Sequence, residues 1–331
     1  MKKSLVILLA ASTVLAACNK EQKGKGGLLY TVHHDAGATK IKEGDFIKID
    51  FIQKNDKDSI LDATYDHEQS RIFPVGKKVY AGDMNDVLTL FGEGDSVTFK
   101  LNIDTMVFYN KQPRPDQFKD QKYLNYTIKI QKVLSKKPNE VDSVYQKRAN
   151  EFFTADYKAN LDKKKAGEAA KMKKYAEDNN LKVTTTASGL QYVILAPGTG
   201  PKPVWGDTAV VDYTGKLTFK KISGVDNVFD TSIKAIAEKT MTPNPMKQFA
   251  PTPIPLAENI AKGFVEALQL IGKGGKITVI MPSKLGYGEQ GGGPIGPYSP
   301  LVFDIEIKNI IKGNPSAIAP PAPVAPAPAA Q

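Results

Sequence analysis

The sequence predicts an α+β protein made of two copies of one domain, each an antiparallel sheet with one short helix, joined by a long helix. The first observation is a repeat: GLLY (27–30) recurs as GLQY (189–192), and GEGDSVTFKL (92–101) recurs as GKGGKITVIM (272–281). The second is alternation of apolar and polar residues within each copy, and the third is a helical segment between the copies. We expect the copies to span residues 28–134 and 183–312, each of ordinary domain size.

Alternating segments predict the strands of both copies. IKIDF (47–51) in the first copy and AVVDYTG (209–215) in the second alternate as half-buried strands do. One helical stripe stands out in the second copy, where Phe264, Leu268 and Ile271 recur at helical spacing and would pack on a sheet.

The segment 139–180 predicts a long helix, because it contains no proline and one glycine. Its first part carries an apolar face that includes Tyr145 and Phe152, whereas Lys, Glu and Ala dominate after Leu161. We expect an apolar beginning and a solvated end. The helix is interpreted as a spacer, with docking of its early face on a domain or on a second chain as the alternative.

The two ends of the chain predict export and anchoring. Residues 1–17 combine two lysines, a short apolar run and small residues, as a secretory signal does, and the run is too short to span a bilayer. Small residues before Cys18, the only cysteine, resemble a bacterial lipobox, so Cys18 is expected to carry lipid; an ordinary signal peptide is the alternative. Residues 18–27 read as a lipidated tether and 313–331 as a disordered Pro/Ala-rich tail.

Composition excludes several kinds of chemistry. A single acylated cysteine leaves no disulfide or thiol catalysis, and three histidines without metal-ligand spacing argue against a metal site. No phosphate-binding or dinucleotide motif is present, so no cofactor is expected. The formal charge of +10 is interpreted as solvated surface, and export argues against nucleic acid.

Six segments of the second copy follow one another in a recognisable order: VVDYTGKL (210–217), VFDTS (228–232), GFVEALQLI (263–271), MPSKLGYG (281–288), GGPIGP (292–297) and LVFDIEI (301–307). Through them nearly all of 183–312 resembles the FKBP-type peptidyl-prolyl isomerases, above all their Mip-like bacterial branch. The resemblance implies a twisted antiparallel sheet wrapped around a short helix, with an apolar pocket between them that binds X-Pro segments.

The resemblance also implies a role for each pocket residue. Tyr213, Phe229 and Phe303 would form the aromatic walls, and Phe264 the floor. Asp230 would be the buried acid, Tyr287 would donate its hydroxyl to the substrate, and Ile295 would cap the pocket. Phe264 stands where the family usually has tryptophan. The glycine-rich loop 284–297, far longer than the two to five residues that a hairpin needs, would be the flap that delivers Tyr287 and Ile295.

Several departures from the family pattern concern substrate binding. The backbone donor for the substrate carbonyl falls on Ala261, or on Ile260 if one residue is inserted, and Ile254 replaces an aromatic residue. The arginine expected to pair with the acid falls on Ala235, with Lys234 as a possible substitute. Residues 219–227 and 234–253 are longer than in the family and would either narrow the pocket or extend its binding surface.

The first copy is degenerate by the same comparison. Phe51 replaces the wall tyrosine, Leu61-Asp62 replaces Phe-Asp, and Tyr126 replaces the last phenylalanine. Residues 104–123 have neither Tyr-Gly nor GGPIGP, so this copy is not expected to catalyse and would bind clients or partners, or act as a platform.

The leading hypothesis is a lipid-anchored prolyl isomerase that assists folding of exported, proline-containing polypeptides in the bacterial envelope. The residues after Cys18 lack the aspartate associated with inner-membrane retention, so the outer membrane is expected. The alternatives are a non-catalytic chaperone made of two FKBP-like modules and a docking component of an envelope complex. The sequence gives no oligomeric state.

Overall fold

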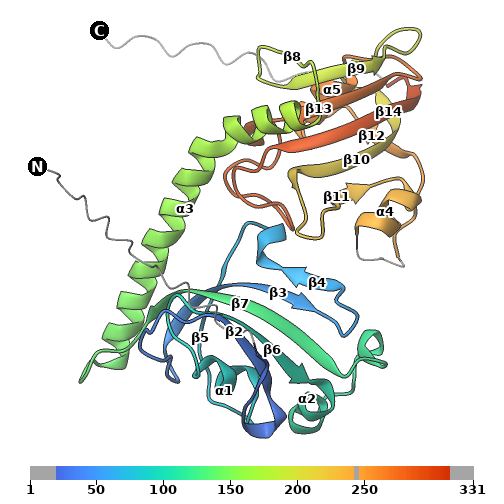
Figure 1. Ribbon diagram of the computed structural model, residues 1–331. Helices are drawn as coiled ribbons and strands as arrows, with labels where there is room; N and C mark the ends of the chain where they lie inside the picture. Colours follow the sequence, from blue (N-terminus) through green and yellow to red (C-terminus); the bar gives the residue numbers. More distant parts are fainter. Residues whose placement is uncertain (1–19, 242–245, 314–331) are drawn as a thin grey trace, which may run out of the picture. The chain divides into compact units, whose positions relative to one another are not determined.

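The computed structural model describes residues 20–241 and 246–313, which form two compact units (Figure 1). One unit comprises residues up to 64 and 70–140; the other comprises 65–69 and residues from 141 onward. Cys18, the signal segment and the tail beyond residue 313 lie outside the described residues, so the predictions made for them stay predictions.

The first unit is built on a seven-stranded antiparallel sheet with the order β1-β2-β6-β7-β3-β4, in which β5 also pairs with β3. Val87 and Leu88 of α1 are fully buried against the sheet residues that form the core, among them Phe99 and Ile128. The strands and helices are β1 (Gln22–Lys23), β2 (Leu29–His34), β3 (Phe46–Lys54), β4 (Ile60–Ala63), β5 (Arg71–Pro74), α1 (Met84–Leu88), β6 (Ser96–Asn102), α2 (Ile103–Asn110) and β7 (Tyr123–Leu134).

The second unit repeats this sheet strand for strand, in the order β8-β9-β13-β14-β10-β11, with β12 paired to β10. Its core gathers apolar side chains from α5 and from the sheet, including Leu268 and Val279, which are fully buried. The elements are α3 (Asp142–Asp178), β8 (Thr184–Thr185), β9 (Gln191–Ala196), β10 (Thr208–Lys220), β11 (Asp226–Thr231), α4 (Lys234–Thr240), β12 (Thr252–Pro255), α5 (Lys262–Leu268), β13 (Lys276–Met281) and β14 (Leu301–Ile311).

The predicted fold class, two antiparallel sheets with a long helix between them in the chain, is confirmed. Each sheet, however, carries a second short helix that the sequence reading did not include. Asn102 caps α2 by accepting the Thr105 N–H at 2.9 Å, which starts a helix directly after a strand. The helix α4 lies in the long segment 234–253.

The helix α3 is 37 residues long, and its late part is not fully solvated as expected. Met172 and Ala176 are buried against Ile280 and Val302 of the second sheet, with Tyr175 and Leu181 packed beside them. The helix is therefore partly a structural element of the second unit, and a simple spacer is an incomplete description. The sequence obscured this contact because only a few apolar residues are spread among many lysines.

Candidate active site

Four aromatic rings meet in the second unit, each delivered by a different element. Tyr213 lies on β10, Phe229 on β11, Phe264 on α5 and Phe303 on β14. Their neighbouring rings are edge-to-face, with centroids 6.0 Å apart for Tyr213–Phe264, 5.0 Å for Phe264–Phe303 and 5.6 Å for Phe229–Phe303. This geometry is favourable for aromatic pairs, and the rings together make an apolar surface between helix and sheet.

Gly215 allows the rings to lie over the sheet. It is paired with Phe303 on β14 and with Asp230 on β11. A Cβ atom at this position would lie 2.6 Å from the Phe303 ring and 2.7 Å from the Phe229 ring, too close for either to stay in place. The absence of a side chain here is therefore a condition for the aromatic cluster.

A hydrogen-bonded pair lies at the edge of the cluster. The Tyr213 hydroxyl donates to Oδ2 of Asp230 at 2.5 Å, and the Lys247 ammonium pairs with Oδ1 of the same carboxylate. Burial raises the pKa of the Tyr213 phenol strongly, and the Asp230 carboxylate raises it further. The phenol therefore stays protonated and remains a donor to Asp230.

Lys247 was not predicted as the partner of Asp230. The suggested substitute, Lys234, instead pairs with Glu238 one helical turn away, at 3.8 Å. Lys247 belongs to the long segment 234–253, and its distance in sequence from Asp230 gave no local signal. One signal in the sequence could have indicated Lys247: the expected arginine is missing, and the inserted segment contains a lysine.

The start of α5 presents a free backbone donor. The Ile260 N–H donates to the Ala257 carbonyl at 3.2 Å, so it is already engaged. Ala261 precedes the helix, and its carbonyl accepts from Phe264 and Val265, whereas no acceptor for its own N–H exists among the described residues. Of the two candidates that the sequence left open, Ala261 is the one with an available donor. Ile260 and Ile254 are partly buried and pack against the core cluster.

The loop between β13 and β14 brings two predicted residues to the site. Ile295 is buried within the core cluster, and its backbone exchanges hydrogen bonds with Gly292 at 2.8 and 3.0 Å. Tyr287 remains 48 % exposed, with its ring close to Gly292, where a Cβ would lie 2.8 Å from it. The Tyr287 phenol also contributes to the raised pKa of Tyr213.

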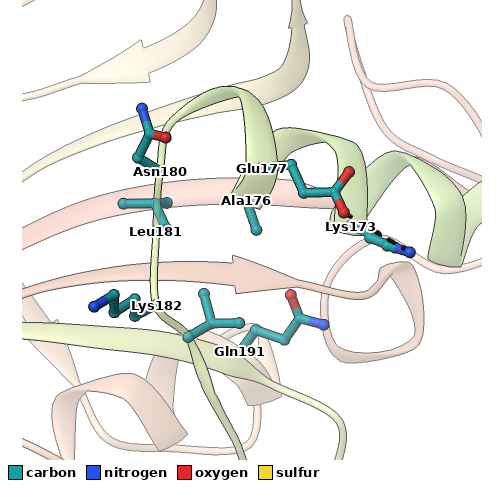
Figure 2. A pocket seen from close by; sticks show the side chains of 8 residues that line it. Lys173, Ala176, Glu177, Asn180, Leu181, Lys182 and Gln191 are labelled. Atoms are coloured by element: carbon teal, nitrogen blue, oxygen red, sulfur yellow. Dashed lines mark ion pairs between the residues drawn. The ribbon is translucent and has the colours of Figure 1, made fainter.

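A separate hollow of about 640 Å³ lies at the end of α3 and beside β9 (Figure 2). None of the predicted site residues lines it. Its lining mixes charged, polar and apolar side chains: Lys173, Ala176, Glu177, Asn180, Leu181, Lys182, Val183 and Gln191. Lys173 and Glu177 pair with each other at 3.7 Å, so neither charge converges on a ligand. We therefore assign the site to the aromatic cluster.

Among residues 20–241 and 246–313, no group of three or more His, Cys, Asp or Glu side chains is arranged to hold a metal ion. Within the same ranges, no helix combines the length and the apolar character that crossing a bilayer requires.

Comparison with known proteins matches the second unit. Residues 200–308 match the family described as FKBP-type peptidyl-prolyl cis-trans isomerase. The FKBP-type peptidyl-prolyl cis-trans isomerase FkpA of Aeromonas hydrophila is 36% identical over 185 residues, which are 55% of this chain and 57% of that protein. The outer membrane protein MIP of Legionella longbeachae is 35% identical over 161 residues, 44% of this chain and 60% of that protein.

Among solved structures, the crystal structure of FkpA from Escherichia coli shares 28% sequence identity and has a TM-score of 0.40. That alignment covers 64% of this chain and 83% of the other. The chain spans about half to three-fifths of the length of curated relatives such as these two.

Proposed function

We propose that the second unit, whose residues 200–308 match the FKBP-type peptidyl-prolyl cis-trans isomerase family, catalyses cis-trans isomerisation of X-Pro bonds in exported polypeptides. One observation carries the proposal beyond the family match. The rings of Tyr213, Phe264 and Phe303 form an apolar cluster with hydrogen-bonding groups at its edge. That combination suits a reaction that makes and breaks no covalent bond.

The reaction requires rotation about an amide whose barrier is about 18–20 kcal/mol. The barrier arises because the planar amide gains stability from charge separation between nitrogen and oxygen, and water stabilises that separation. In an apolar environment, the free energy of the twisted, less polar state therefore lies closer to that of the planar state than it does in water. The four aromatic rings would therefore act by excluding water from the bond and by fitting the twisted amide better than the planar one.

Two donors would hold the substrate while the bond rotates. The N–H of Ala261 would bind one substrate carbonyl, and Tyr287, exposed on its loop, would donate its hydroxyl to another. Ile295, Ile254 and Ile260 would border the proline ring. The two donors would fix the chain on either side of the rotating bond, which lowers the entropic part of the barrier.

Asp230 and Lys247 would act on the pocket wall rather than on the substrate. Asp230 accepts the Tyr213 hydroxyl, and Lys247 neutralises the carboxylate from the opposite oxygen. Lys247 would thus take the role of the family's arginine, whose position is occupied by Ala235 in this chain. Its ion pair would also connect the long segment 234–253 to the rim of the pocket. Both residues are partly exposed, so their ion pair is expected to contribute little to stability.

The test is isomerisation of a short X-Pro peptide by the full chain, by Tyr287→Phe and by Asp230→Ala. We expect acceleration by the parent and a loss of about tenfold in kcat/KM in each variant, the upper end for loss of one hydrogen bond of about 0.5–1.5 kcal/mol. Trp205, the single tryptophan, packs against the core of the second unit, so its fluorescence checks that the variants stay folded. A folded parent without acceleration would sink the enzyme proposal.

We further propose that the protein acts in the bacterial envelope, anchored to the outer membrane through lipid on Cys18. The support is the arrangement of residues 1–18 and the name of the Legionella relative. Metabolic labelling with a radioactive fatty acid checks it. Label in the parent and none in Cys18→Ala is expected; equal label in both would remove the anchor.

A second candidate activity, polypeptide binding by the first unit, is favoured by exposed Phe108 and Tyr109 together with half-buried Tyr80. Tyr80 and Tyr109 stack at 4.7 Å, and Phe108 is 74 % exposed beside them. Such a surface would bind apolar segments of unfolded chains. Replacing Phe108 with Ser should weaken suppression of client aggregation while leaving peptide isomerisation unchanged; if aggregation is suppressed equally, this activity is excluded.

A further inference from the structure

The loop that carries Tyr287 and Ile295 is fastened to the long helix α3 as well as to its own sheet. The helix, green in Figure 1, passes beside this loop, and Glu168 accepts the backbone N–H of Ser283, the first residue of the turn Ser283–Leu285. Ser283 is 4 % exposed. A buried N–H requires an acceptor, and here a side chain of the linking helix supplies it.

The peptide of Ser283 in turn organises the residues around Tyr287. Its carbonyl accepts the N–H of Gly286 and the N–H of Gly288, each at 2.8 Å, so that Tyr287 lies between two amides fixed to one oxygen. The carbonyl of Gly288 then accepts the N–H of Tyr298 at 3.1 Å. A continuous path of hydrogen bonds therefore runs from Glu168 through Ser283 to both ends of the loop.

Two lysines of α3 contact the far end of the same loop. The Lys165 ammonium lies 5.6 Å from the centroid of the Tyr298 ring, a cation–π contact. A Cβ at Gly296 would lie 3.2 Å from Nζ of Lys164, so the loop backbone approaches this ammonium closely. Burial lowers the pKa of Lys164, which agrees with a side chain partly withdrawn from water.

The contacting residues follow helical spacing. Lys164 and Glu168 are half-buried one turn apart, and the same face continues to Met172 and Ala176, which pack on β13 and β14. One face of α3 thus contacts the sheet through apolar side chains and the loop through polar side chains. The polar part of this face has the composition of a solvated helix, although its partners are the backbone and an aromatic ring of the loop.

We propose that α3 is part of the catalytic unit, with Glu168 as a positioning residue that holds the Tyr287 loop in its working conformation. This rests on the proposed isomerase function, because the value of the clamp is the placement of Tyr287 and Ile295 over the aromatic cluster. The helix that joins the two units therefore also determines how well the second unit's pocket is closed. Strain or bending of α3 would be transmitted to the loop through Ser283.

The test compares Glu168→Ala with Glu151→Ala in the full chain. Glu151 is an exposed glutamate of the same helix that pairs with Lys147 at 3.9 Å, so its replacement matches the loss of charge and side chain. Hydrogen exchange of the peptide covering 283–299 and kcat/KM on an X-Pro peptide are measured for each. Trp205 fluorescence checks the fold, and Glu168→Gln, which keeps an acceptor oxygen, is the conservative variant.

We expect Glu168→Ala to speed exchange within 283–299 at least about threefold and to lower kcat/KM about three- to tenfold. Glu151→Ala and Glu168→Gln should stay near the parent. Unchanged exchange in Glu168→Ala would overturn the clamp. Faster exchange in a chain whose parent shows no catalysis would keep the clamp and reject the isomerase instead. If Glu168→Ala unfolds, Lys165→Gln, which removes the contact with Tyr298, must loosen the same peptide.

Discussion

The two units share one sheet topology, but they carry different side chains at the positions that form the aromatic cluster in the second unit. Gly215 in the second unit pairs with Phe303, and Gln53 in the first pairs with Tyr126 in the same register. Over Gly215 lie two aromatic rings, whereas Gln53 has a side chain whose amide donates to the Tyr126 hydroxyl at 2.8 Å. The position that the second unit leaves open for its aromatic cluster is occupied in the first.

Two further residues of the first unit, Phe51 and Tyr126, also differ from their counterparts in the second unit. Phe51 stands where Tyr213 donates to Asp230, and its ring lies 6.3 Å from that of Tyr126. Tyr126 in turn stacks on Phe99 at 5.6 Å, and burial raises the pKa of its phenol. In the first unit, hydrogen-bonded and stacked side chains thus occupy the positions that form the aromatic cluster in the second.

The loops above the two interiors are also built differently. In the first unit, α2 and a loop replace the glycine-rich flap, and Arg114 donates to the carbonyls of Phe118 and Gln121 at 3.0 and 2.7 Å. The same sheet topology therefore carries two different sets of side chains, since the fold depends on strand pairing and not on the identity of these few residues.

The largest expected effect comes from giving the second unit the side chain of the first. Gly215→Gln would place a polar side chain among Phe229 and Phe303, so kcat/KM should fall at least about 100-fold, as expected when the reacting geometry is displaced. Assay of X-Pro isomerisation checks it. Activity within twofold of the parent would show that the rings are not the site.

The matched change, Gln53→Gly, should produce no activity in a chain whose second unit is inactivated by Gly215→Gln. Removing one side chain empties space in the first unit but supplies neither the Tyr213–Asp230 pair nor the flap. Recovered isomerisation in this double variant would show that the first unit retains a latent site.

The next effect concerns the helix residue beneath the pocket. Phe264→Ala should destabilise the second unit by about 3–5 kcal/mol and remove most activity, because Phe264 is nearly buried and contacts two other rings. Met84 occupies the corresponding turn of α1 and is only partly buried. Met84→Ala should leave kcat/KM unchanged, and denaturant titration followed by Trp205 should separate the two. Equal losses would contradict the assignment of catalysis to one unit.

A smaller effect is expected from Lys247, the cation that pairs with Asp230. Lys247→Met should lower kcat/KM about two- to fivefold, because Asp230 would lose its ion pair but keep the Tyr213 hydroxyl. Lys247→Arg should retain most of the activity. A loss of equal size in both variants would mean that the segment 234–253 acts through its shape rather than through this cation.

The smallest effect is in the pH dependence of stability. The folded-state pKa of Tyr213 is raised above the value of about 10 for a free phenol, so its hydrogen bond stabilises the fold fully below pH 10. As the pH rises above 10 toward the folded-state pKa, this contribution is lost. The difference in unfolding free energy between the parent and Tyr213→Phe, followed by Trp205 fluorescence, should be constant from pH 7 to 9 and shrink above pH 10. A constant difference up to pH 11 would contradict the raised pKa.

The sequence by itself determined the repeat, most of the strands and the aromatic residues that meet in the second unit. Alternation and helical spacing are local, so IKIDF and GFVEALQLI indicated β3 and α5 without knowledge of their neighbours. The helix α2 was missed because Ile, Val, Phe and Tyr in 103–110 favour strands, whereas the Asn102 cap starts a helix.

Only the tertiary structure decided which residues meet across the chain. Lys247 rather than Lys234 reaches Asp230, Gln53 fills the interior that Gly215 leaves open, and Glu168 holds Ser283. Each of these contacts joins residues distant in sequence through strand register or helix docking. Composition constrains such contacts weakly. In the sequence, a lysine or glutamate that is solvated cannot be distinguished from one that contacts a loop, because only the fold determines which partner lies beside it.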